Sequence, residues 1–510
     1  MTTAVYSIQP GSYSMTRTGS HVQTIERILN PRRVAVVGVT SSGFGFGSGI
    51  LASLLSIGFE GELFPVNPKG GSIYGLDIRP SVDDIPGDMD FAIIALPAHL
   101  VPDALEACGR KGAAGAEILS AGFRESGTAE GIALEERVRQ IARGGIRVIG
   151  PNCFGVYSPR SGLTLLPGPS LSRDEGHFAF LSQSGGHTID IAHMGTWHGI
   201  GFRAAISFGN GADLRETELL EHFADDTGTR VIGMYLEGVD DGRRFFISLK
   251  NACARKPVIV YKGGLSEAGG KAVASHTASL GGSRVIWNSL LKQCNAVSVD
   301  SIPAMADAAL AFSMLPPRPY RGISMIGGGG ALGVAAADAA DAYGMELPAL
   351  DARTQEAIMD LLPRPGSSAA NPVDVANPYV SAEVIRKVLF LAAEDERVDI
   401  QLLVQLLYHY KAALGMFGNP PLADIVPVEA LADAAREVFE ATGKPVIAVL
   451  PNPLRDAGSM EVESLMRDAR RAFLARGVPV FDDLGSAVRS TGCVSRYVAV
   501  RERRESAVSP

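Results

Sequence analysis

The sequence lacks the patterns that mark disulfide-bonded, zinc-binding and membrane-spanning proteins. Its 510 residues contain 5 cysteines, all widely separated, so neither a disulfide framework nor a zinc knuckle is indicated. No apolar run reaches the roughly 18 residues that a membrane helix needs. The segment from Met1 to Arg33 is polar and has no signal-peptide core. We therefore expect a cytoplasmic protein with reduced thiols that does not contact a membrane.

Concentrated positive charge is missing as well. The net charge is −8, and the only short basic run is Arg501-Glu-Arg-Arg504, so a nucleic-acid partner is not expected. There is no Gly-x-x-x-x-Gly-Lys-Ser/Thr loop that would indicate an ATP site. His187, His193 and His198 are close in the sequence, but their spacing does not place them on one helical face. No metal site is therefore predicted.

Glycine and small apolar residues are abundant, and they occur in alternating strand and helix patterns. The chain has 58 glycines and 46% hydrophobic residues, which is typical of an α/β protein. Short β-branched runs between helical patterns predict parallel sheets. Strands are expected at 34–39, 63–66, 91–96, 117–119 and 146–149, then at 178–181, 204–207, 231–236, 258–261 and 296–298, and finally at 323–326, 400–404 and 446–450.

Glycine- and proline-rich segments divide these strands into three domains, because 510 residues exceed what one core usually supports. The borders are the segment 150–173 and the connector 315–319. We expect an N-terminal extension (1–30), a Rossmann-like domain (31–158), a second doubly wound domain (159–316), a third α/β domain (320–500) and a tail (501–510). Ligands of such sheets gather beyond the carboxyl ends of the strands.

The first glycine-rich loop, Gly38–Gly49, follows the first strand and leads into a helix, as phosphate-cradling loops do. It does not match the dinucleotide fingerprint, because the Gly-x-Gly-x-x-Gly template lands on Ser48 or Ile50. After the second strand, where a ribose-binding acid would belong, the sequence has Lys69. NAD is therefore disfavoured, whereas CoA, NADP or a tight turn without a ligand remain open.

The second loop, Leu181–Gly186, opens a helix after the first strand of the second series. A nucleophile elbow needs glycine two residues before Ser184, and Ser182 stands there instead. Backbone and hydroxyl donors at a helix N-terminus suit an anion better than they suit a serine hydrolase.

His276 lies in Val273–Gly282, a run of small and hydroxylated residues that suits a phosphate-carrying imidazole. Glu237 follows the strand at 231–236 and is expected at the same sheet edge. A carboxylate bonded to one imidazole nitrogen leaves the other nitrogen nucleophilic. The alternatives are a small-residue loop with one exposed histidine and a solvated glutamate beside a helix.

Together these motifs resemble the nucleoside-diphosphate-forming acyl-CoA synthetases, relatives of the succinyl-CoA synthetase α subunit, over residues of about 30 to 500. The resemblance implies a Rossmann-like CoA-binding domain and two flavodoxin-like domains. It rests on the first glycine-rich loop, 67–69, 95–98, 119–123 and 150–155 for the first domain, on 181–185, 207–210, 236–243 and 275–282 for the second, and on 327–330 and 370–374 for the third.

The resemblance also implies roles for individual residues. His276 would be the phosphorylated residue and Glu237 its partner. Phosphate would be bound by Ser184, Gly185, Gly281 and Gly282, and CoA by Thr40, Ser41, Ser42, Gly43, Gly45, Asn67, Lys69, Pro97, Ser120 and Asn152. The chain departs from the family pattern at Ala278, where glycine is usual, and at Phe44-Gly-Phe46, where the loop usually contains Pro-Gly-Ser.

The implied function is that of an α-type subunit that joins a small carboxylic acid to CoA while ATP becomes ADP and phosphate. The third domain is followed only by a short tail, so the ATP-grasp module is not on this chain. A β subunit that binds ATP or ADP with Mg²⁺ is therefore expected, in a hetero-oligomer. The alternatives are an ATP-independent CoA transferase or acyl-CoA lyase on the same scaffold, and a noncatalytic CoA-binding protein.

Overall fold

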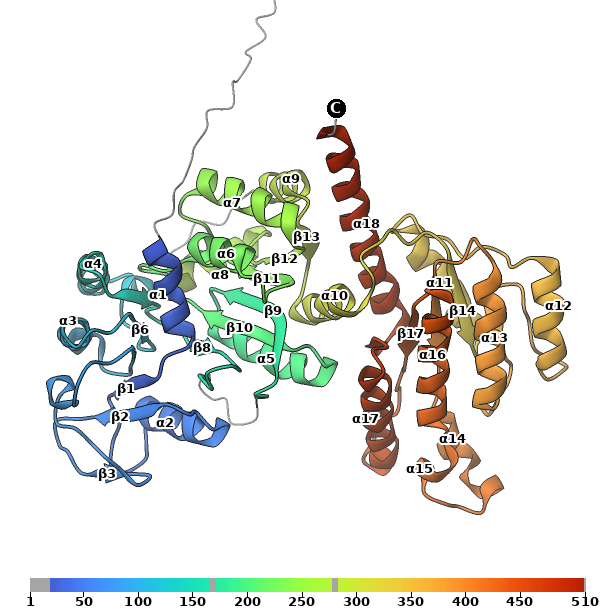
Figure 1. Ribbon diagram of the computed structural model, residues 1–510, viewed down its shortest axis with the longest axis horizontal. Coiled ribbons are helices and arrows are strands. Elements are labelled where there is room, and N and C mark those ends of the chain that lie inside the picture. Colours follow the sequence, from blue (N-terminus) through green and yellow to red (C-terminus); the bar gives the residue numbers. More distant parts are fainter. Residues whose placement is uncertain (1–18, 165–170, 278–282, 509–510) are drawn as a thin grey trace, which may run out of the picture.

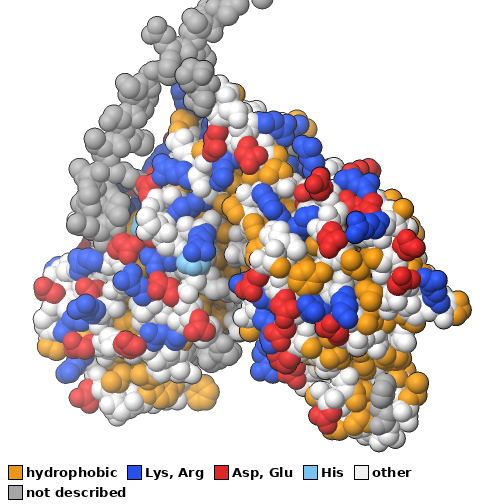
Figure 2. All heavy atoms as spheres, turned by 45° about the vertical axis from the view of Figure 1, so that its right-hand side comes forward, with side chains coloured by type: hydrophobic (Ala, Val, Ile, Leu, Met, Phe, Trp, Pro, Cys, Tyr) orange, Lys and Arg blue, Asp and Glu red, His pale blue; other side chains and the backbone are white. Residues whose placement is uncertain are grey.

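The computed structural model describes residues 19–164, 171–277 and 283–508. They form three α/β domains, and the second (green) lies between the first (blue) and the third (yellow to red) in Figure 1. No helix among these residues is long and apolar enough to cross a membrane. Basic and acidic side chains are interspersed over the face shown in Figure 2.

The first domain contains a parallel five-stranded sheet of order β2-β1-β5-β6-β7. Its strands are β1 Arg33–Val37, β2 Glu62–Val66, β5 Phe91–Ile94, β6 Gly115–Ile118 and β7 Arg147–Ile149, with a small hairpin of β3 Ser72–Ile73 and β4 Leu76–Asp77. Its helices are α1 Gly19–Leu29, α2 Phe46–Ile57, α3 Val101–Arg110 and α4 Ala129–Arg143, with single turns η1 Val82–Asp84, η2 Ala98–Leu100 and η3 Arg124–Ser126. Helices cover both faces, which explains why the central strands are almost entirely apolar.

The second domain has a six-stranded sheet of order β13-β12-β11-β9-β10-β8, in which only β8 is antiparallel among the described strands. The strands are β8 Gly155–Tyr157, β9 Glu175–Ser182, β10 Phe202–Ser207, β11 Val231–Leu236, β12 Val258–Lys262 and β13 Val297–Val299. The helices are α5 Gly185–His198, α6 Glu216–Asp225, α7 Gly242–Arg255, α8 Glu267–Thr277, α9 Arg284–Cys294 and α10 Ile302–Met314.

The third domain has a parallel sheet of order β15-β14-β16-β17-β18. The strands are β14 Ile323–Gly327, β15 Val373–Asp374, β16 Ile400–Val404, β17 Val446–Val449 and β18 Val480–Phe481. The helices are α11 Gly330–Asp341, α12 Ala352–Leu361, α13 Ala382–Glu394, α14 His409–Ala413, α15 Leu422–Ile425, α16 Val428–Thr442, α17 Met460–Ala475 and α18 Leu484–Val508, with turns η4 Leu414–Phe417 and η5 Ala457–Ser459.

The three domains share one strand order. When the parallel strands of each domain are counted along the chain, the order is 2-1-3-4-5, that of flavodoxin-like doubly wound sheets. Each sheet therefore has a switch point beside its first strand, between β1 and β5, between β9 and β11, and between β14 and β16. The predicted α/β class with parallel-sheet domains is confirmed, and the loops after these strands are where ligands are expected.

Two local features differ from the sequence-based expectation. Strand β8 precedes the border that we expected at residue 158, yet it pairs with β10 of the second sheet. The small and hydroxylated residues of Val273–Gly282 favour a loop, but helix α8 continues through Thr277. Alanine, glutamate and lysine in α8 favour helix, and Val273 is buried near Gly264. Residues 278–282 lie outside the described part of the chain.

The second and third domains share a hydrophobic core. Helix α10 packs against α18, and one apolar cluster contains buried side chains from both sheets. Phe312 and Tyr497 meet edge to face with ring centroids 5.6 Å apart, and the Tyr497 hydroxyl donates to the Cys253 carbonyl at 2.9 Å. These contacts join the two domains through packed side chains rather than through the connector alone.

Candidate functional site

The glycine-rich loop of the first domain lies at the first switch point, directly after β1. Gly38 has a φ of 101°, and a Cβ there would lie 2.3 Å from the Ala95 carbonyl oxygen, so the turn requires glycine. The Thr40 hydroxyl donates to the Phe44 carbonyl at 2.7 Å, and the Thr40 amide donates to Ser48 Oγ at 2.9 Å. The loop is therefore shaped by its own hydroxyl groups, while Phe44 and Phe46 are 82% and 71% exposed.

The other predicted CoA-binding residues follow neighbouring strands at the same sheet edge. Asn67 and Lys69 follow β2, Pro97 follows β5, Ser120 follows β6, and Asn152 follows β7. The structure thus places these residues along the same edge of the five-stranded sheet as Thr40, Ser41, Ser42, Gly43 and Gly45.

Asn67 braces this edge and leaves Lys69 available. Asn67 Nδ2 donates to the Val39 carbonyl at 2.7 Å, and its Oδ1 accepts from the Lys69 amide at 2.9 Å. The Lys69 ammonium group forms no hydrogen bond or ion pair with a described residue. A lysine at the same sheet edge as a hydroxyl-rich, glycine-rich loop suits a phosphate group, so the prediction that this edge binds CoA stays a prediction.

The second switch point contains Ser184 and Gly185. Ser184 is the N-cap of α5, and its Oγ accepts from the His187 amide at 3.3 Å. A Cβ at Gly185 would lie 2.7 Å from the Phe154 ring, so glycine lets that aromatic ring approach the start of the helix. The positive end of the α5 dipole is therefore directed at the carboxyl edge of the second sheet.

Glu237 follows β11, the strand beside β9, and is 6% exposed. Its backbone amide donates to Gln183 Oε1 at 2.5 Å, and the Gly238 amide donates to the same oxygen at 3.0 Å. The carboxylate accepts from the Tyr235 hydroxyl at 3.2 Å through Oε1, whereas Oε2 is buried without a hydrogen-bond partner among the described residues. Burial and the neighbouring Glu237 charge raise the pKa of Tyr235, which keeps its hydroxyl protonated. A buried acceptor without a donor is costly, so this oxygen marks a position for one.

Gln183 and Lys262 are structural parts of the site that the sequence analysis did not single out. Lys262 is the last residue of β12, is 5% exposed, and donates to the carbonyls of Glu237 (2.8 Å) and Gly263. Its ammonium lies 5.1 Å from the Trp287 ring centroid, and burial lowers the pKa of the Lys262 amine. The sequence feature that could have indicated this role is a lysine at the end of an otherwise apolar strand.

His276 lies near the end of α8, which follows β12 and contacts η3 of the first domain. Its side chain, together with Gly281 and Gly282, lies outside what the structure describes, so the expected pairing with Glu237 stays a prediction. The helix nevertheless starts after β12, which pairs with the strand β11 that precedes Glu237, and it contacts η3 after β6 of the first domain.

A polar junction holds these two edges beside each other. Asn210, which follows β10, donates to Glu125 at 2.5 Å and to Glu135 at 2.9 Å in the first domain. Asn152 Nδ2 donates to Asn210 Oδ1 at 3.4 Å. Glu125 also accepts from the Gly122 amide at 2.6 Å, next to the loop after β6. This junction fixes the position of the Ser120 loop relative to the second domain.

The other histidines and the Asn371 motif of the third domain pack against or bond to neighbouring protein groups. His187 packs edge-on against Tyr235, with ring centroids 4.5 Å apart, and His198 is buried at the end of α5. Among the described residues, no group of three or more His, Cys, Asp or Glu is arranged to hold a metal ion. In the third domain, Asn371 Nδ2 donates to the Ile323 carbonyl at 2.9 Å and its Oδ1 accepts from the Met325 amide at 3.0 Å, which braces β14.

Comparisons with known proteins agree with this geometry. A CoA binding domain model matches residues 32–159, and a model of the succinyl-CoA ligase like flavodoxin domain matches residues 175–312. The structure of Ca. Korarchaeum cryptofilum acetyl-coenzyme A synthetase 1, solved in complex with phosphate and ADP, superposes with a TM-score of 0.77 at 28% identity. That match covers 95% of this chain and 99% of the other.

Sequence relatives cover most of the chain. It is 40% identical to the α subunit of Pyrococcus furiosus ADP-forming acetate–CoA ligase I, covering 69% of this chain and 76% of the relative. The chain is also 35% identical to the α subunit of ligase II from the same organism, and that match covers 83% of this chain and 89% of the relative. Acetate–CoA ligase I of Archaeoglobus fulgidus is 36% identical over 82% of this chain, which spans only 61% of that relative. The chain therefore belongs to the family of ADP-forming acyl-CoA synthetases related to the succinyl-CoA synthetase α subunit.

Proposed function

We propose that this chain is the CoA-binding and phosphate-carrying part of an ADP-forming acid–CoA ligase. The reaction joins a carboxylic acid to CoA while ATP is converted to ADP and phosphate. His276 accepts the phosphoryl group and passes it to the acid, whose acyl phosphate then reacts with the thiol that CoA supplies.

One observation carries this proposal most strongly. Glu237 is buried at the switch point of the second sheet with one carboxylate oxygen unbonded among the described residues, beside the Ser184-capped start of α5. That oxygen suits the N–H of an imidazole, which would fix the tautomer of His276 and leave its other nitrogen nucleophilic. The N-terminus of α5 suits the transferring phosphate.

The contact between α8 and the first domain supports phosphate transfer between the two sheet edges. This helix starts beyond β12 and reaches η3, next to the Ser120 loop of the first domain. A phosphate carried by His276 is then close to the edge where Lys69 and the Thr40 loop hold CoA. Ser184, Gly185, Gly281 and Gly282 are the groups proposed to bind the phosphate.

The nucleotide step requires a further module. Two relatives are named as α subunits, whereas this chain spans 61% of the Archaeoglobus protein. We propose that an ATP-grasp module, on a separate β subunit or on a longer chain, binds ATP or ADP with Mg²⁺ and exchanges phosphate with His276. With a separate subunit the assembly is a hetero-oligomer.

The test is to incubate the purified chain with radiolabelled phosphate and a panel of acyl-CoAs, followed by mapping of acid-labile label. We expect label on His276, its loss in His276→Ala, and unchanged CoA binding in that variant. Glu237→Gln should reduce labelling at least tenfold, because the neutral amide can still accept the imidazole N–H but lacks the negative charge that orients the ring and stabilises it when phosphorylated. Retained thioester formation by His276→Ala with the partner present would contradict the carrier role.

The alternative is an ATP-independent CoA transferase or acyl-CoA lyase on the same scaffold, which would use the CoA binding domain that residues 32–159 match. Turnover of an acyl-CoA by the chain alone, without nucleotide or phosphate, would establish it.

A further inference from the structure

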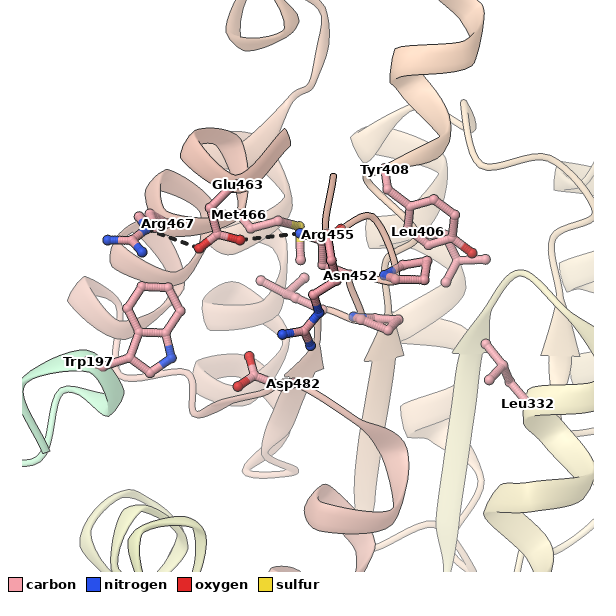
Figure 3. Close-up of a pocket in the computed structure, with 13 residues that line it drawn as sticks. Trp197, Leu332, Leu406, Tyr408, Asn452, Arg455, Glu463, Met466, Arg467 and Asp482 are labelled. Atoms are coloured by element: carbon pink, nitrogen blue, oxygen red, sulfur yellow. Dashed lines mark hydrogen bonds and ion pairs between the residues drawn. The ribbon is translucent and has the colours of Figure 1, made fainter. Parts of the chain in front are cut away.

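A pocket of about 580 Å³ lies between the second and third domains, away from the site described above (Figure 3). It is formed by the loops after β16, β17 and β18, by α11 and α17, and by Trp197 near the end of α5. Its position includes the switch point of the third sheet, where doubly wound domains bind ligands. Its volume is within the range of small-molecule sites.

The two carboxylates of the lining are already neutralised. Glu463 accepts from Arg467 Nε at 3.1 Å and from Asn452 Nδ2 at 3.3 Å. Asp482 accepts from Arg470, which is 2% exposed. These pairs satisfy the acidic side of the pocket and hold its walls in place.

Arg455 is the remaining charged residue of the pocket lining. It is exposed, and it forms no hydrogen bond or ion pair with any residue that the structure describes. Figure 3 shows its guanidinium group in the middle of the pocket, between Asn452 and Asp482. Because Glu463 is paired with Arg467, and Asp482 with the buried Arg470, Arg455 is the one charged lining residue without a partner among the described residues. A guanidinium group binds a carboxylate through two parallel hydrogen bonds.

The rest of the lining is apolar and aromatic. Leu332, Leu406 and Tyr408 lie on one side in Figure 3, and Trp197 lies on the other. The Trp197 ring is held by the guanidinium carbons of Arg470 at 4.7 Å and Arg467 at 5.1 Å from its centroid. Such walls suit a flat apolar body larger than the methyl group of acetate.

We propose that this pocket binds an organic monocarboxylate with an apolar body of about phenyl size, and that it is separate from the reaction centre. Arg455 pairs with the carboxylate, and the body lies on the Trp197 side of the pocket. The separation follows from α5, whose 14 residues span about 21 Å between the Ser184 end and the Trp197 end. A ligand that touches Trp197 and Arg455 contacts both domains and holds them in this arrangement.

Titration of the full-length chain with 3-phenylpropionate, its uncharged amide and acetate tests the proposal by calorimetry and tryptophan fluorescence. We expect saturable binding of 3-phenylpropionate, with the amide and acetate at least tenfold weaker. Arg455→Gln should abolish the preference for acid over amide. The matched control is Arg353→Gln, an exposed arginine of the same domain that does not line the pocket.

Fluorescence locates the bound probe, because the chain has 2 tryptophans and Trp287 lies elsewhere, against Lys262. The response should disappear in Trp197→Phe. No saturable binding at millimolar concentrations, an unchanged preference in Arg455→Gln, or displacement of the probe by saturating CoA would each overturn the proposal. The readout is binding, so the result does not depend on whether the chain is a ligase.

Discussion

Glu117 makes the pH dependence of folding testable. It lies in β6 of the first domain, is 1% exposed, and accepts the Val156 amide at 3.0 Å through Oε2. Its Oε1 is buried without a hydrogen-bond partner among the described residues, and Gly155 packs directly over the carboxyl group. Burial raises the pKa of the Glu117 carboxyl from 4.5 to about 8, against the smaller opposing effect of the Val156 hydrogen bond. The side chain is therefore protonated in the folded protein at neutral pH.

The sign of the effect follows from proton binding. The folded protein holds this proton more tightly than the unfolded chain, so the free energy of unfolding decreases as pH rises from about 4.5 to about 8. One pH unit of pKa difference corresponds to about 1.4 kcal/mol, which gives a loss of up to about 5 kcal/mol over that interval. Glutamine does not ionise, so the free energy of unfolding of Glu117→Gln should not decrease in this way. The difference in free energy of unfolding between Glu117→Gln and the native chain should therefore rise with pH.

Urea unfolding of the native chain and of Glu117→Gln at about pH 5 and about pH 9 measures this difference. We expect Glu117→Gln to be equally or slightly less stable at the lower pH and more stable by several kcal/mol at the higher pH. The control is Glu130→Gln, a change at an exposed glutamate of α4, which should show no such trend. A stability difference for Glu117→Gln that stays constant or shrinks with pH would refute the reasoning.

Three further changes test the sites. Gly38→Ala should destabilise the chain by on the order of 3 kcal/mol in thermal unfolding, because Gly38 has a φ of 101° and an added Cβ would clash with Ala95. The control Gly344→Ala should cost about 1 kcal/mol, because the space around its Cβ is open. Equal costs would contradict the close-approach argument. Ser184→Ala should cost about 1 kcal/mol in urea unfolding through the lost N-cap, and Ser184→Asn should restore most of it. Lys69→Gln should weaken CoA binding about tenfold in calorimetry, unlike a Lys387→Gln control in the third domain; an unchanged Kd would exclude a phosphate contact.

Long apolar strands were predictable, because a sheet covered by helices on both faces needs nearly continuous buried residues. The runs at Val231–Leu236 and Ile400–Val404 are strands with these bounds in the structure. Strands β15 and β18 have two residues each, too few for a periodic pattern. Strand β8 was missed because an edge strand beside glycine- and proline-rich segments has little apolar length.

The site was predictable where a residue directly follows a strand. The loop after β1, Ser184 after β9 and Glu237 after β11 lie at switch points because the strand order places them there. Gln183 and Lys262 act through hydrogen bonds to the Glu237 backbone, and the sequence separation of these partners hides the contact. The α8 helix around His276 depended on how Val273 packs, which small-residue composition does not reveal.

By itself, the sequence determined the α/β class, the succession of domains and the residue types at the strand ends, because burial and backbone sterics act locally along the chain. Only the tertiary structure decided which of these ends share an edge, that Glu237 keeps one buried oxygen without a described partner, and that Arg455 and Trp197 line one pocket. The reason is physical: hydrogen-bond satisfaction and charge pairing depend on neighbours from distant segments, and folding alone brings those neighbours together.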